Sequence, residues 1–149
     1  MKKIIFVVMS LFAVLLIYGC TTHSAIVLNE SLPKEETVTI YWITAGVHPV
    51  VYNGISVDWQ LKKTGWNTII IPAGVVTFEL QGTQYDTTYI GNVRHSTAYT
   101  WDGISFSYNF EKGREYTVSP LFSTIRIYNG KSYAMSDKDL IEVIRPKWE

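Results

Sequence analysis

The chain has 149 residues, with 13 basic (Lys and Arg) and 13 acidic (Asp and Glu) side chains. This length suits one domain, and the balanced charge leaves no polybasic patch, so nucleic acid is excluded as an expected partner. Because 47% of the residues are hydrophobic and 14% are aromatic, the composition excludes a disordered chain and predicts a domain with its own core.

The amino terminus has the pattern of a secretory signal. Lys2 and Lys3 precede an apolar stretch, Ile4–Ile17, which only Ser10 interrupts. The alternative is a permanent transmembrane helix, but a span needs about 20 apolar residues and this stretch is shorter. The sequence therefore predicts that residues 1–19 are a signal peptide that is removed.

The only cysteine of the chain, Cys20, lies at the end of this signal. The segment Leu16-Ile17-Tyr18-Gly19-Cys20 resembles the lipobox of bacterial lipoproteins. The resemblance implies that Cys20 is acylated on its sulfur, that the chain is cleaved before it, and that its new amino group is acylated too. Two or more acyl chains anchor a protein stably in a membrane. A buried or reactive free thiol fits poorly with an exported chain whose single cysteine lies at the cleavage site.

The residue after the cysteine bears on the expected location. In enterobacterial lipoproteins a residue other than Asp at this position implies sorting to the outer membrane, and here it is Thr21. The resemblance therefore implies a protein of the cell envelope, in the outer membrane, whose domain faces the periplasm or the outside. Membrane lipid, through acylated Cys20, is the first expected partner.

Residues 20–36 are expected to form the lipidated cysteine and a tether, because this segment is polar at both ends and contains Pro33. Its middle, Ala25–Leu28, could instead form an edge strand, and the sequence leaves both possibilities open. The β-sandwich domain is expected to occupy residues 37–149.

The body of the chain has a hydrophobic period of two, which predicts about eight to ten short strands. Three turn dipeptides favour the positive φ values of type I′ hairpins, and each predicts two adjacent antiparallel strands. They are Asn53-Gly54, Asp102-Gly103 and Asn129-Gly130. The second hairpin would pair Trp101 with Ile104. The fold class is therefore all-β, an antiparallel β-sandwich or an open barrel.

Two features complete the expected fold. The alternation of residues 55–61 predicts a half-buried strand. Ser136-Asp137-Lys138-Asp139 resembles a capping box, and the apolar residues after it share one helical face before Pro146, which predicts a short C-terminal helix docked on the sheet. The aromatic residues expected in the core are Trp59, Tyr99, Trp101, Phe106 and Tyr108.

Three segments together resemble a known kind of domain. They are Tyr52-Asn53-Gly54-Ile55-Ser56-Val57, Ile71-Pro72-Ala73-Gly74 with Phe78, and Phe110-Glu111-Lys112-Gly113-Arg114-Glu115-Tyr116. This pattern is similar to the small sandwich domains of PEGA type and the related DUF2846-type bacterial lipoproteins. The resemblance implies a non-catalytic envelope module and assigns no functional residue.

The sequence offers no catalytic constellation. It has no Gly-Xaa-Ser-Xaa-Gly elbow, and His48 and His95 each stand apart from any second histidine. Asp58 and Glu79 are candidate acids of a glycosidase by position alone. We therefore expect no enzyme activity, no cofactor and no metal. An envelope-polymer hydrolase is the less favoured alternative.

A small basic and aromatic patch is the candidate binding surface. Tyr41, Tyr128 and Tyr133 fall opposite the aliphatic residues of their strands, and a hairpin at Asn129-Gly130 would pair Arg126 with Tyr133. The predicted patch is Arg126, Tyr128 and Tyr133. The expected function is a membrane-anchored, non-catalytic binding or structural module of the cell envelope, with an envelope protein or a glycan as partner. A carbohydrate-binding lipoprotein and a lipocalin-like carrier are alternatives.

Overall fold

A computed structural model describes residues 25–27, 32–57, 59, 61 and 64–147, and nearly all of its regular structure is β-strand. The predicted signal peptide (1–19) and Cys20 lie outside the described residues. Within the described part, the elements are β1 (Ala25–Val27), a 3-10 helix η1 (Lys34–Glu36), β2 (Thr37–Ala45), β3 (Val47–Tyr52), β4 (Ile55–Ser56), β5 (Thr64–Pro72), β6 (Gly74–Ile90), β7 (Val93–Thr100), β8 (Ile104–Phe110), β9 (Glu115–Leu121), β10 (Thr124–Asn129) and β11 (Leu140–Ile144). None of the helical structure described is long and apolar enough to cross a membrane.

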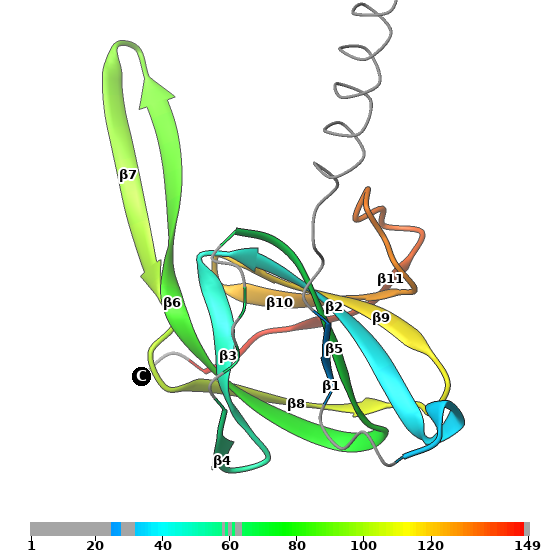
Figure 1. Ribbon diagram of the computed structural model, residues 1–149. Coiled ribbons are helices and arrows are strands. Elements are labelled where there is room, and N and C mark those ends of the chain that lie inside the picture. Colours follow the sequence, from blue (N-terminus) through cyan, green and yellow to red (C-terminus); the bar gives the residue numbers. More distant parts are fainter. Residues whose placement is uncertain (1–24, 28–31, 58, 60, 62–63, 148–149) are drawn as a thin grey trace, which may run out of the picture.

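The strands form two sheets (Figure 1). One sheet has the order β1-β5-β2-β9-β10-β11, and the other has the order β4-β3-β6, with β7 and β8 both paired to β6. The predicted all-β, sandwich-like fold is confirmed. Two pairings, β1 with β5 and β2 with β9, are parallel, so the first sheet is mixed rather than antiparallel throughout. Neither sheet closes on itself in the described part of the chain, so the barrel that a lipocalin-like carrier requires is not formed.

The core lies between the two sheets and is rich in aromatic side chains. Alternate residues of β2, among them Ile40 and Trp42, are fully buried against alternate residues of β6. The ring of Phe78 on β6 meets the indole of Trp42 on β2 edge to face, with centroids 5.6 Å apart. Trp59, Trp101 and Phe106 are buried, as their phase in the sequence predicts.

Ala25–Val27 is an edge strand, which selects one of the two possibilities open for this segment. It runs parallel to β5, with Ala25 opposite Thr68 and Val27 opposite Ile70. The first sheet therefore begins five residues after Cys20.

The prediction of a hairpin at Asp102-Gly103 is wrong. Residues 93–100 and 104–110 do not pair with each other, because both strands pair with the long strand β6, one after the other along the same direction. Asp102-Gly103 is therefore a kink between β7 and β8. The reversal lies at Gly91-Asn92, between β6 and β7. Packing explains the outcome, because this pairing places Phe106 beside Phe78 in the same sheet, with centroids 5.6 Å apart, and 6.3 Å from the ring of Trp42 in the other sheet.

The hairpin at Asn53-Gly54 is confirmed. Both residues have positive φ, 47° and 79°, and they join Tyr52 to Ile55 as a type I′ turn requires. The strand that follows is shorter than predicted, because β4 ends at Ser56. Asp58, one of the candidate acids, lies outside the described residues.

Two predictions for the C-terminal part of the chain are wrong. The dipeptide Asn129-Gly130 does not close a tight hairpin, because β10 pairs with β11 across the segment 130–139, and Arg126 lies opposite Val143 rather than Tyr133. The predicted C-terminal helix is instead strand β11. Ser136 does cap one turn, since its Oγ accepts a hydrogen bond from the Lys138 amide at 3.3 Å. The chain then becomes extended, because its β-branched residues favour the open edge of β10.

Candidate functional site

The three residues of the predicted binding patch do not share one surface. Tyr128 is only 1% exposed, because the segment after β10 folds back over the outer face of the six-stranded sheet. This cover is tied to the sheet through Thr117, whose hydroxyl donates to the Gly130 carbonyl at 2.8 Å and accepts from the Ser132 amide at 3.0 Å. Arg126 is half-buried farther along β10, and Tyr133 is exposed.

Tyr133 instead lies in a cluster on the outer face of the same sheet. Its ring packs against Trp66 of β5, with centroids 5.0 Å apart. The ammonium of Lys131 lies over two tyrosine rings, 4.8 Å from the centroid of Tyr41 on β2 and 5.1 Å from that of Tyr133. We call Tyr41, Trp66, Lys131 and Tyr133 the aromatic patch.

Sheet register explains how the aromatic patch forms. Trp66 lies opposite Ile43, and Tyr41 lies opposite Thr68, so the two rings are neighbours on adjacent strands and point to the same outer face. Lys131 and Tyr133 reach this face from the segment between β10 and β11. The patch therefore combines a rigid base on two paired strands with a contribution from the covering loop.

The surroundings of the aromatic patch favour a protonated Lys131 and a neutral Tyr41. Burial raises the pKa of the Tyr41 hydroxyl, and the carboxylate of Glu115 raises it further through its charge and a hydrogen bond. A hydrogen bond with Tyr133 raises the pKa of the Lys131 ammonium, with smaller contributions of the same sign from Tyr41 and Glu115. The patch thus presents one fixed positive charge between aromatic faces.

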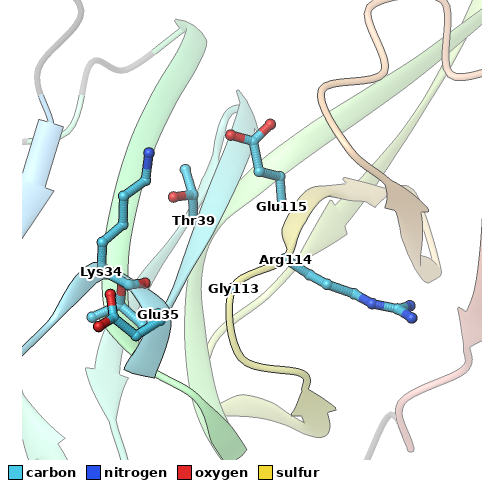
Figure 2. A pocket seen from close by; sticks show the side chains of 7 residues that line it. Lys34, Glu35, Thr39, Gly113, Arg114 and Glu115 are labelled. Atoms are coloured by element: carbon cyan, nitrogen blue, oxygen red, sulfur yellow. The ribbon is translucent and has the colours of Figure 1, made fainter.

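A polar pocket lies where β2 and β9 begin, and Figure 2 shows its lining side chains. It has a volume of about 440 Å³ and is lined by Lys34, Glu35, Thr37, Thr39, Gly113, Arg114 and Glu115. Figure 2 shows the Arg114 side chain turned away from Lys34 and Thr39, which agrees with its ion pair to Glu111 at 3.0 Å.

Thr39 and Glu115 connect the polar pocket to the aromatic patch. They lie opposite each other on β2 and β9, and Tyr41 follows Thr39 on the same face of β2. Glu115 lines the pocket and also interacts with Tyr41. The two features therefore form one continuous surface, with charged and hydroxyl groups at one end and aromatic rings at the other.

The other candidate residues are not brought together. Glu79 lies on β6 between Val51 and Ser105, and His95 lies opposite Thr88 on the projecting hairpin. His48 lies on β3. Among the residues that the structure describes, no group of three or more His, Cys, Asp or Glu side chains could hold a metal ion.

The sequence predicts part of this surface. The phase of Tyr41 and Tyr133 indicates that both face outward. Trp66 lies in an apolar run, although its alternation with buried Asn67 and Ile69 carries the outward signal. No sequence pattern predicts that Glu115 and Lys131 lie here. The parallel pairing of β2 with β9 brings Glu115 to Tyr41, and the folded segment after β10 brings Lys131 to the same ring.

Comparisons with known protein families, curated proteins and solved structures find no match for this chain. The resemblance to PEGA-type and DUF2846-type domains therefore stays a prediction.

Proposed function

We propose that this chain is a membrane-anchored bacterial lipoprotein of the cell envelope, and that its β-sandwich is a non-catalytic module that binds a glycan. The observation that carries the binding proposal is the aromatic patch beside the polar pocket. Sugar rings have apolar C–H faces that stack on aromatic side chains, and their hydroxyl groups bind to charged and hydroxyl side chains at the rim. On β2, Thr39 lines the polar pocket and Tyr41 belongs to the aromatic patch, so the surface offers both kinds of group side by side.

The anchor rests on Cys20 and the signal that precedes it. Five extended residues span at most about 18 Å, so the acylated Cys20 of this proposal lies within that distance of Ala25. The six-stranded sheet is then held close to the membrane. The outer membrane is the proposed location, with the domain facing the periplasm or the outside.

The anchor is tested by intact-mass analysis of protein from the membrane fraction of its native host. The expected mass is that of residues 20–149 plus acyl chains. Protease treatment of intact cells then reports which side the domain faces. An unprocessed mass would overturn the lipoprotein proposal and leave the glycan proposal to be tested separately.

The binding site is tested by screening immobilised envelope glycans and repeating the measurement on single variants. We expect Trp66→Ala and Tyr133→Ala each to weaken binding about two- to tenfold, the effect of losing one aromatic contact. Tyr85→Ala is the matched control, because Tyr85 is 68% exposed on another part of the molecule. Binding that is absent, or that falls equally in all three variants, would contradict a glycan site at the aromatic patch and leave a structural envelope module.

A further inference from the structure

The hairpin formed by the second half of β6 and by β7 projects from the sandwich as an arm (Figure 1). The arm runs from the Thr83–Thr100 pair to the Ile90–Val93 pair and reverses at Gly91-Asn92.

Its base is fixed to the sandwich. The side-chain amide of Gln84 donates a hydrogen bond to the Pro120 carbonyl at 2.9 Å and accepts one from the backbone N–H of Phe122 at 2.7 Å. The ring of Tyr99 packs on Phe122, with centroids 5.4 Å apart.

Beyond this base, the arm has no cover. Every residue from 87 to 98 is exposed, on both faces of the hairpin. At the tip, Tyr89 is 67% exposed, Ile90 is 66% exposed and Val93 is 59% exposed. A two-stranded hairpin is marginally stable on its own, and these apolar side chains gain nothing from the fold of a single chain. The tip is therefore built to contact something else.

The charge of the tip narrows the choice of partner. No carboxylate occurs between residues 87 and 101, and Arg94 and His95 lie next to the apolar tip. Asp86 lies nearer the base, opposite Thr97. The outer part of the arm is thus apolar with one positive charge, that of Arg94, which complements a surface of anionic headgroups over hydrocarbon.

We propose that the tip, residues 89–94, inserts into the interfacial layer of a membrane that contains anionic lipid. Ile90 and Val93 form the apolar wedge, Tyr89 lies at the headgroup level that tyrosine favours, and Arg94 binds lipid phosphate. The depth is limited, because the free strand edges of the arm carry backbone groups that need water. The ligand is therefore the lipid interface and not the bilayer centre.

A second copy of the chain is a weaker candidate for this contact. A stable protein interface buries about 800 Å² on each partner, and the tip offers three large apolar side chains. A membrane contact needs less area, because an anchored protein meets the same surface at high effective concentration.

The direction of the arm agrees with the proposed anchor, and to this extent the inference rests on the proposed function. β1 and β5 are parallel and run away from the side toward which the arm points (Figure 1). The end of β1 to which the proposed anchor is joined therefore faces the arm's side.

The test uses full-length protein processed in its host and reconstituted into vesicles of phosphatidylethanolamine and phosphatidylglycerol. Val93→Cys is labelled with an environment-sensitive dye, and Asn109→Cys, exposed on β8, is the matched control. We expect brominated lipids to quench the dye at residue 93 at least threefold more than the dye at residue 109. Arg94→Gln, or vesicles without phosphatidylglycerol, should reduce this difference.

Equal quenching at the two positions overturns the proposal. Energy transfer between labelled copies, without quenching by brominated lipid, would assign the tip to a second copy. Dye burial that occurs only in native membranes would assign it to a protein partner. If intact mass shows no acyl chains, the lipoprotein proposal fails, and the tip is still tested by adding the labelled chain, with Cys20→Ser, to preformed vesicles.

Discussion

At the scale of single residues, Gly82 is a position where the backbone of the second sheet tolerates no side chain. It lies opposite Val47 at a φ of 141°, and a Cβ there would come within 2.0 Å of the Gly46 carbonyl oxygen. Neither backbone can move without breaking the pairing of β3 with β6. We expect Gly82→Ala to lower the free energy of unfolding by about 3 kcal/mol or more, measured by chemical denaturation.

Gly103→Ala is the control for this substitution. Gly103 also has positive φ, 71°, but nothing lies within 4 Å of the position a Cβ would occupy. We expect a loss of about 1 kcal/mol, the strain of a left-handed non-glycine residue alone. Equal losses in the two variants would show that backbone strain, and not close approach, sets the requirement at Gly82.

Three half-buried tyrosines make the fold sensitive to alkaline pH. The pKa values of Tyr41, Tyr52 and Tyr108 are all raised above 10.0, in each case chiefly by burial. A raised pKa in the folded state means that the native protein holds these protons more tightly than the unfolded chain. Stability is therefore fully present below pH 10 and falls as the pH rises above it.

This dependence is measured by denaturation at a series of pH values from 8 upward. Tyr41→Phe should reduce the slope of the loss above pH 10, because it removes one of the groups that bind the proton more tightly in the native state. Glu115→Gln should reduce it as well, since Glu115 contributes to raising the Tyr41 pKa. An unchanged slope in both variants would contradict the role of this pair.

Residue phase in the sequence identified much of the core and only part of the candidate site. Trp101 and Phe106 are buried where their alternation places them. Tyr128 has the phase of an outward residue and does point to the outer face, but the segment 130–139 covers it. Alternation reports the face of a strand, whereas exposure also depends on what packs over that face.

At the scale of elements, the arm contributes little to the stability of the sandwich. Residues 87–96 are exposed throughout, and the base is held by Gln84 instead. Replacing residues 87–96 with Asn-Gly would join Asp86 to Thr97 through a type I′ turn. We expect the free energy of unfolding to change by less than about 0.5 kcal/mol.

Gln84→Ala is the contrasting variant. It removes both hydrogen bonds at the base of the arm and leaves the Phe122 amide and the Pro120 carbonyl without that partner. We expect a loss of about 1–3 kcal/mol by chemical denaturation. If shortening the arm lowered the free energy of unfolding as much as Gln84→Ala does, the outer hairpin would stabilise the sandwich, and this prediction would be wrong.

The turn signals show what local sequence decides and what it does not. Asn53-Gly54 forms the expected hairpin, whereas Asp102-Gly103 forms a kink with the same kind of residues. The difference lies in β6, which is long enough to pair with β7 and β8 in succession. Gly91-Asn92 also has the composition of a hairpin turn. A dipeptide thus marks a permitted turn, and long-range pairing decides which permitted turn reverses the chain.

At the scale of the whole molecule, stability should fall from the sandwich to the tip of the arm. The centre is Phe78, whose ring lies within about 6 Å of the rings of Trp42, Tyr52 and Trp59, with Phe106 and Phe110 also close by. Phe78→Ala should lower the free energy of unfolding by about 3–5 kcal/mol, since it opens a cavity between the sheets.

Native-state hydrogen exchange measures this gradient residue by residue. Amides of β2 and β5, between buried side chains, should exchange only through global unfolding, and their protection should fall by the full effect of Phe78→Ala. Amides of residues 87–98 should exchange fastest and be insensitive to that substitution, because the outer arm opens without the core. Vesicles of anionic lipid should slow exchange at residues 89–94 alone. If the amides of the arm were as strongly protected from exchange in water as those of β2 and β5, the arm would unfold together with the sandwich and not as a separate unit.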